Sequence, residues 1–106
     1  MIGLETALSI VQMTMVDTGL LDWAGVAEAM SYRPARIGRL DGHGRPIAVG
    51  EPANLVLYDA TATRVVDPTE TASLSRNTPY SGMELPGRVV ATFLRGKPTV
   101  LDGKLS

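Results

Sequence analysis

The first sixteen residues place apolar and polar side chains with a helical period. Apolar residues recur three or four positions apart from Leu4 to Val16, a spacing that lines up one face of an α-helix. Glu5 would lie in the first turn, where a carboxylate suits the positive end of the helix dipole. Gly19 is suited to ending this helix in the left-handed conformation. The apolar set is Leu4, Ala7, Leu8, Val11, Met15 and Val16.

Two shorter helices are predicted before residue 41. Asp22 is positioned to cap a helix of about two turns. Pro34 disfavours helical backbone at Arg33, so this helix is expected to end there. Pro34 itself suits the first turn of a third helix, Pro34–Leu40. Trp23 and the five methionines are interpreted as fillers of the core or of helix interfaces. The apolar residues of the second helix are Trp23, Val26, Ala27 and Met30.

Turn and strand signals begin at Asp41. The run Asp41-Gly42-His43-Gly44 is typical of a turn. About four strands are expected after it, the first holding the run Leu-Val-Leu-Tyr that is typical of a buried strand. A tight Gly96-Lys97 turn is expected to join the last two. The predicted strands are Asn54–Asp59, Thr63–Val66, Arg88–Arg95 and Pro98–Leu101.

A polar stretch, residues 67–87, separates the second and third predicted strands. Its start, Asp67–Glu70, combines a cap, a proline and an acidic residue, which predicts a single helical turn. A cluster further along could clamp an anionic ligand. The preferred interpretation is structural: its asparagine and threonine satisfy backbone groups, its proline stiffens the loop and its tyrosine packs its ring. The cluster consists of Arg76, Asn77, Thr78, Pro79 and Tyr80.

The order of these elements predicts an α+β fold, or two pieces of a larger fold. Helices occupy residues 1–40 and strands occupy residues 41–106. A four-stranded sheet buries a face only if something covers it. Either the helices or strands from outside this sequence could do so.

Composition and charge narrow the functions. The 106 residues are 44% hydrophobic and carry a formal net charge of −1. The scattered lysines and arginines do not indicate nucleic-acid binding. No apolar stretch approaches the roughly 20 residues of a membrane helix, and no signal peptide is recognisable. The absence of cysteine excludes thiolate nucleophiles and cysteine-ligated zinc, and it agrees with a cytoplasmic location.

No catalytic, metal or cofactor residue can be assigned from the residues alone. Zinc enzymes need about three protein ligands, and His43 is the only imidazole. A nucleophilic triad would also lack its base, and no phosphate-binding loop is present. The carboxylates are not paired: Glu5 and Asp17 lie more than about three helical turns apart. Capping and turn roles are expected for Asp59, Asp67 and Asp102.

Four segments together resemble the C-terminal region of type I dihydroorotases in the amidohydrolase superfamily. The resemblance extends over residues 3–104. The first three segments indicate only the superfamily, and the fourth narrows it to dihydroorotase or allantoinase. Asn54 stands where aspartate is more usual. The segments are Gly3–Leu8 (G-x-E-T), Arg33–Gly38 (P-A-x-x-x-G), Gly50–Asp59 (G-x-x-A-D-L-V-x-x-D) and Asn77–Gly82 (N-T-P-F/Y-x-G) with the following Gly87-Arg88-Val89 and Thr92.

The resemblance implies the last helices of a TIM-like barrel over residues 1–40 and part of a small β-sandwich over residues 41–106. It implies a zinc-dependent hydrolase that interconverts N-carbamoyl-aspartate and dihydroorotate in pyrimidine biosynthesis. The family's metal ligands and base aspartate lie upstream of the position of Met1. None is therefore transferred, zinc is expected only in the parent enzyme, and this chain alone is expected to be inactive. Glu5 and the 76–80 cluster remain structural or interaction residues.

The implied partners are the rest of the dihydroorotase barrel and aspartate carbamoyltransferase, which some family members bind. Self-association is also expected, because a sandwich without its N-terminal strands leaves unpaired edges. A helix that begins almost at Met1 is typical of a fragment. Two alternatives stay open: a non-catalytic docking or scaffold module, and a fragment of allantoinase or another cyclic amidase.

Overall fold

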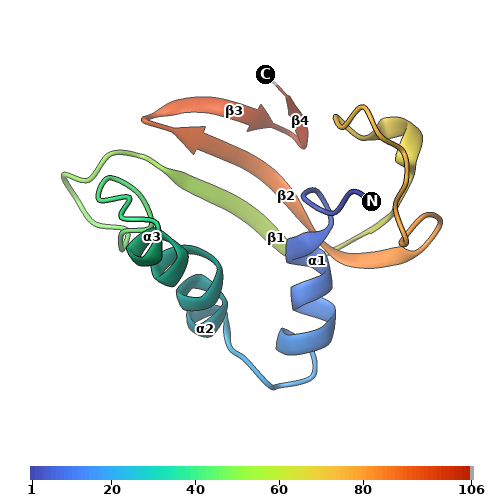
Figure 1. Cartoon of the computed structure of the whole chain (residues 1–106), viewed down its shortest axis with the longest axis horizontal. Coiled ribbons are helices and arrows are strands. Elements are labelled where there is room, and N and C mark those ends of the chain that lie inside the picture. Colours follow the sequence, from blue (N-terminus) through green and yellow to red (C-terminus); the bar gives the residue numbers. More distant parts are fainter. Residues whose placement is uncertain (106) are drawn as a thin grey trace.

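The computed structural model describes residues 1–105 and has an α+β architecture. In the described residues, two continuous helical stretches come first, and a four-stranded antiparallel sheet follows in the order β1-β2-β3-β4. Figure 1 shows the helices on one side of the sheet, with α1 separated from α2 and α3 by an extended connection. The strands are β1 (Leu55–Val65), β2 (Glu84–Leu94), β3 (Lys97–Leu101) and β4 (Lys104–Leu105).

The first helix begins later than its apolar pattern predicts. It consists of α1 (Ala7–Val11) and a π-helical continuation, η1 (Gln12–Val16). Leu4 lies outside it and is 94% exposed, because the Thr6 amide and hydroxyl donate hydrogen bonds to the Gly3 carbonyl and close a separate turn. Gly19 does adopt a positive φ of 82° just after the helix, as predicted.

The second and third predicted helices are one continuous helical stretch. It runs through α2 (Trp23–Ala27), the π-helical η2 (Glu28–Tyr32) and α3 (Arg33–Ile37). The predicted Asp22 cap is confirmed, because its carboxylate accepts a hydrogen bond of 2.7 Å from the Gly25 amide. The helical backbone therefore continues without a break from Trp23 to Ile37.

The predicted helix end at Arg33 is wrong. Arg33 has helical angles, φ −67° and ψ −46°. Proline lacks the amide that would continue the regular bonding ladder, and the wider turns of η2 immediately before it accommodate that loss. The helix also ends at Ile37 rather than Leu40.

Strand β1 merges the first two predicted strands. Its register against β2 shifts between Asp59 and Thr63, where several β1 residues are accommodated as an irregularity rather than a break. The prediction of a buried first strand is wrong, since Val56 and Leu57 are 47% and 50% exposed. Among the described residues β1 pairs only with β2, so it lies at the edge of the sheet.

The turn between β2 and β3 falls one residue earlier than predicted. Arg95 and Gly96 have φ values of 51° and 80°, the pair of positive angles that a tight hairpin turn of the I′ type requires. The Asn54 side-chain oxygen accepts a hydrogen bond of 2.8 Å from the Arg95 amide and supports this turn. A second positive-φ pair, Asp102 and Gly103, leads into β4, which the sequence pattern did not predict.

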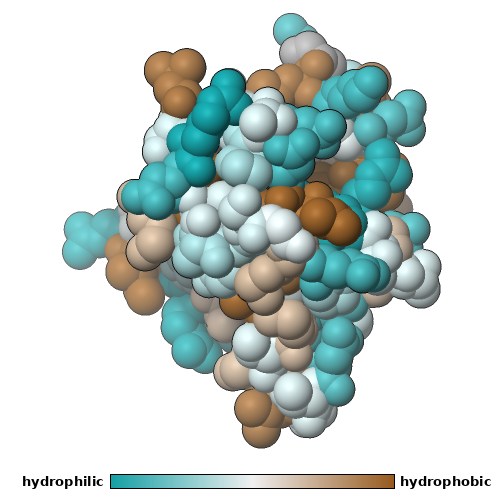
Figure 2. Space-filling model, turned by 90° about the vertical axis from the view of Figure 1, so that its right-hand side faces the viewer, coloured by the Kyte–Doolittle hydropathy of each residue, from teal (hydrophilic) through white to brown (hydrophobic). Residues whose placement is uncertain are grey.

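Few apolar side chains are fully buried in residues 1–105. The prediction places Trp23 and the methionines in the core or in helix interfaces, and the core part of this prediction is wrong for Trp23, Met1, Met15, Met30 and Met83, which are 36–86% exposed. Trp23 instead packs edge-on against Tyr58, with ring centroids 5.5 Å apart. Figure 2 shows apolar residues distributed over the surface among polar ones. The buried apolar residues are Val26, Ala35, Val66, Leu85 and Ala91.

The predicted turn in the polar stretch is confirmed as η3 (Pro68–Glu70), a 3-10 helix capped by Asp67. No helix within residues 1–105 combines the length and apolar character needed to cross a membrane.

Candidate functional site

A polar joint attaches the first helix to the sheet. Gln12 is buried, and its side-chain nitrogen donates a hydrogen bond of 2.9 Å to the carbonyl of Ala60 in the irregular part of β1. Its side-chain oxygen accepts one of 2.6 Å from the Tyr58 hydroxyl. Ser9, one turn earlier and also buried, donates to the Gly87 carbonyl at 3.5 Å. These bonds orient the helix by satisfying buried polar groups.

The joint leaves no room at Gly87. This residue has a φ of 81°, and a Cβ placed there would overlap the Tyr58 hydroxyl and the Gln12 side-chain oxygen. Glycine is the one residue type that permits both the positive φ and the close contact with Tyr58 and Gln12, so the backbone of β2 can approach the helix here.

The Tyr58 hydroxyl is a hydrogen-bond donor and not a base at neutral pH. Burial raises its pKa, and this effect exceeds the lowering by a hydrogen bond with Ser9 and by the positive charge of Arg64. Its role here is to complete the joint.

A second contact region ties the chain's first residues to the segment between β1 and β2. The Ile2 amide donates to the Asn77 carbonyl at 2.8 Å. The Glu5 carboxylate accepts from the Ala72 amide at 2.9 Å, and the Glu5 carbonyl accepts from the Arg64 guanidinium at 2.7 Å. The prediction that Glu5 lies in the first turn and acts on the dipole of α1 is wrong, because Glu5 lies before the helix and its carboxylate is turned toward this loop.

The structure brings one member of the 76–80 cluster next to Glu5. Thr78 and Glu5 both line a small pocket of about 10 Å³ between the N-terminal turn and the loop. Such a volume suits about one water molecule and no larger ligand. Val66, Thr71 and Ser73 complete the loop side of the pocket.

The other cluster residues mainly organise their own loop. Arg76 donates a hydrogen bond of 2.9 Å to the Pro68 carbonyl. The Thr78 hydroxyl accepts from the Tyr80 amide at 3.2 Å. Pro79 lies between these two and is exposed. A role in binding an anion or a partner stays a prediction for the cluster.

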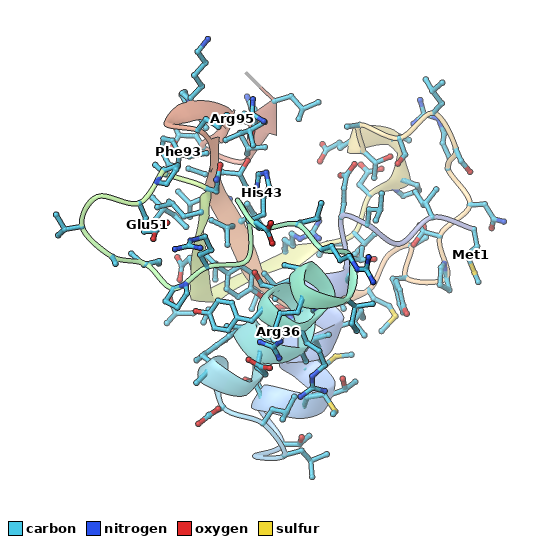
Figure 3. The ribbon with its side chains drawn as sticks, turned by 60° about the vertical axis from the view of Figure 1, so that its left-hand side comes forward. Met1, Arg36, His43, Glu51, Phe93 and Arg95 are labelled. Atoms are coloured by element: carbon cyan, nitrogen blue, oxygen red, sulfur yellow. The ribbon has the colours of Figure 1, made fainter. Side chains whose placement is uncertain are left out.

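A third region is the loop 41–55, which encloses a pocket of about 100 Å³. Arg45 and Glu51 face each other across it as a two-pronged ion pair, with hydrogen bonds of 2.8 and 2.7 Å. The hydrogen bond from Arg45 lowers the pKa of the Glu51 carboxyl. His43 also lines this pocket and is partly buried. Figure 3 places this loop, marked by His43 and Glu51, on the opposite side of the molecule from Met1.

The residues present do not fit a zinc centre. Within residues 1–105 no group of three or more histidine, cysteine, aspartate or glutamate side chains is placed to hold a metal ion. Two of the carboxylates with a predicted turn role have structural partners instead. Hydrogen bonds from Thr61 and Thr69 lower the pKa values of Asp59 and Asp67, respectively.

Sequence reasoning missed the polar joint. Thr6, Ser9 and Gln12 recur every three residues and are all buried, Thr6 at the N-cap position and the other two within the first helix, whereas the prediction followed the apolar residues of the other faces. The signal was available as a polar series at helical spacing within an otherwise apolar segment.

Known proteins match this chain along essentially its whole length. No family model matches it. It is 68% identical to a dihydroorotase of Streptomyces coelicolor over 106 residues, which are 100% of this chain and 25% of that protein. It is 54% identical to a dihydroorotase of Mycobacterium tuberculosis over 105 residues, or 99% of this chain and 24% of that protein.

Solved structures show the same arrangement of helices and sheet. An L-hydantoinase (dihydropyrimidinase) from Arthrobacter aurescens matches 99% of this chain and 23% of its own, with a TM-score of 0.87 and 30% identity. A D-hydantoinase (dihydropyrimidinase) from a Thermus species matches 98% of this chain and 23% of its own, with a TM-score of 0.85 and 28% identity.

The chain spans about a quarter of the length of the curated relatives it matches. High identity over essentially all of its residues confirms the resemblance to dihydroorotases. The chain therefore belongs to the dihydroorotase family and corresponds to the C-terminal part of its relatives.

Proposed function

We propose that this chain is the C-terminal part of a cytoplasmic dihydroorotase, which interconverts N-carbamoyl-aspartate and dihydroorotate in pyrimidine biosynthesis. The observation that carries the proposal is identity of 54–68% to the dihydroorotases of Streptomyces coelicolor, Leifsonia xyli and Mycobacterium tuberculosis along 97–100% of the chain. Identity to the hydantoinase structures over a similar span is 28–30%. A cyclic amide is the common substrate class that these names support.

Each half of the chain has a proposed place in the full enzyme. Residues 1–40 would be the last barrel helix and the helices after it, and residues 41–106 would be part of the small β-sandwich. The polar joint supports this assignment, because it fixes the orientation of the first helix against the sheet. The open edge of β1 would then be paired by strands from another part of the enzyme.

The proposed division of labour leaves chemistry to the rest of the enzyme. Zinc would be bound there, because this chain offers a single histidine and no cysteine. The contribution of these 106 residues would be to support the barrel. We therefore expect the chain alone to be inactive, to associate with the remaining barrel or with itself, and in the full enzyme to be compatible with aspartate carbamoyltransferase as a partner.

The first experiment is to read the DNA immediately upstream of Met1. An in-frame sequence containing a His-x-His pair is expected, and the product of that longer reading frame should hydrolyse dihydroorotate. The 106-residue chain, assayed with added zinc at equal concentration, is the matched control. Turnover by that chain above background would contradict the proposal.

A second candidate is another cyclic amidase, such as allantoinase or a hydantoinase. The hydantoinase structures favour it, with TM-scores of 0.85 and 0.87. The longer product should then be assayed with dihydroorotate, allantoin and hydantoin in parallel. Faster hydrolysis of allantoin or hydantoin than of dihydroorotate would mean that the full-length enzyme is an allantoinase or a hydantoinase and not a dihydroorotase.

A third candidate is a non-catalytic docking or scaffold module. Its support is the number of exposed apolar side chains, including Leu4 at 94% and Leu74 at 101%. Absence of an upstream in-frame metal-binding sequence, together with binding of the chain to a complete dihydroorotase, would favour this module.

A further inference from the structure

The loop 45–51 is closed by an ion pair at its base. The Arg45 guanidinium donates from Nε to Glu51 Oε2 at 2.8 Å and from Nη2 to Oε1 at 2.7 Å. Two parallel hydrogen bonds hold the planar groups in a defined orientation. The Glu51 amide also donates to the Ala48 carbonyl at 3.2 Å, and Gly50 adopts a φ of 91° to complete the turn. The loop therefore has a defined shape while lying on the surface.

The tip of this loop carries two aliphatic side chains in water. Ile47 is 85% exposed and Val49 is fully exposed. Single exposed apolar residues are common on protein surfaces, but two on one constrained loop, rimmed by the charges of Arg45 and Glu51, have the composition of a contact site. Figure 3 shows the loop with Glu51 projecting to the side of the sheet and helices.

The matched proteins are much longer than this chain. Solved structures that align with 98–99% of this chain continue for more than three quarters of their length outside the aligned part. The curated relatives have the same proportions. A covering surface is therefore available within one polypeptide and does not require a foreign partner.

We propose that the loop 45–51 is a docking finger, which inserts Ile47 and Val49 into an apolar surface formed by the polypeptide that precedes this segment in a full-length dihydroorotase. The ion pair at its base orders the loop in advance and so reduces the entropy lost on docking. This inference rests on the proposed function, because it takes its occupant from the same family.

Cysteine labelling tests the finger directly, since the chain has no cysteine of its own. Val49→Cys is made in the 106-residue chain and in a chimaera, in which the same residues replace the matched C-terminal quarter of the Streptomyces coelicolor dihydroorotase. Both are treated with a maleimide, and labelling at position 49 is followed by mass spectrometry of its peptide. The labelling rate in the chimaera is expected to fall by about tenfold or more, as protection in a packed interface requires.

Lys97→Cys is the matched control. Lys97 is an exposed charged residue beside the β2–β3 turn, and such a side chain is expected to stay in water in both proteins. Its labelling rate should be the same in the chain and in the chimaera. Equal labelling at position 49 in both proteins would overturn the finger.

Three further outcomes separate the possible failures. A chimaera that hydrolyses dihydroorotate while position 49 labels freely overturns the finger and leaves the proposed function intact. A chimaera that protects position 49 but has no activity supports the finger and counts against the proposed function. Protection in the 106-residue chain that grows with its concentration would make a second copy the occupant and overturn the commitment to the full-length polypeptide.

Discussion

The Tyr58 hydroxyl lies 2.6 Å from the side-chain oxygen of Gln12, although 46 residues separate them in sequence. The hydroxyl donates, and the amide of the same glutamine then donates to the carbonyl of Ala60. One buried glutamine thus satisfies a tyrosine on β1 and a backbone group in the irregular part of that strand. These directional hydrogen bonds fix the orientation of the first helix relative to β1.

Removing the hydroxyl is expected to destabilise the chain. Tyr58→Phe leaves the Gln12 oxygen without this donor in a buried site, which costs about 1 to 2 kcal/mol of unfolding free energy. Urea denaturation followed by circular dichroism measures the change. Gln12→Leu and the double variant complete a mutant cycle, in which the combined loss should be smaller than the sum of the single losses. Simple additivity would mean that the two side chains are not coupled.

Gly87→Ala is expected to be more harmful than any other glycine substitution in the sheet. The added methyl would overlap Tyr58 and Gln12, and the residue would also keep a positive φ. We expect a loss of about 3 kcal/mol or more. Gly96→Ala is the control, because Gly96 has a similar φ of 80° but open space around it, so only backbone strain of about 1 kcal/mol applies. Similar melting temperatures for the two variants would contradict the close approach.

The raised pKa of Tyr58 predicts a loss of stability at alkaline pH. A hydroxyl that ionises less readily in the folded state contributes stability below its ordinary value, 10.0. This contribution disappears as pH rises through the raised folded value. Tyr58→Phe should therefore lose less unfolding free energy than the original chain over that interval, as followed by urea denaturation. Parallel curves for both proteins would show that Tyr58 is not responsible.

The lowered pKa of Asp67 predicts the opposite dependence in acid. Hydrogen bonds from the Thr69 hydroxyl and amide favour its charged form. Its contribution is present above the ordinary value of 3.8 and is lost as pH falls through the folded value. The difference in unfolding free energy between the original chain and Asp67→Asn should shrink over that range. A difference that does not change with pH would show that the Asp67 carboxylate is not responsible for the loss of stability in acid.

Local features were accessible from the sequence because neighbouring residues create them. Asp22 caps the amide of Gly25, three residues on, and Asp67 caps that of Thr69, two residues on. Gly19 takes the left-handed angle expected after a helix. The order of helices and strands, the family resemblance and the scarcity of metal ligands also follow from the order and identity of the residues alone.

Tertiary structure decided which side of each element lies inward. Gln12 and Tyr58 come together only when helix and sheet pack. The sequence shows a polar series in the first helix, but only the packing against the sheet decides that this series is buried. The same holds for Leu57, whose exposure depends on what covers its face of β1. The spacing of apolar and polar residues in a helix or strand shows which residues share a face. The free energy of long-range contacts, and of the groups that must be satisfied there, selects the face that is buried.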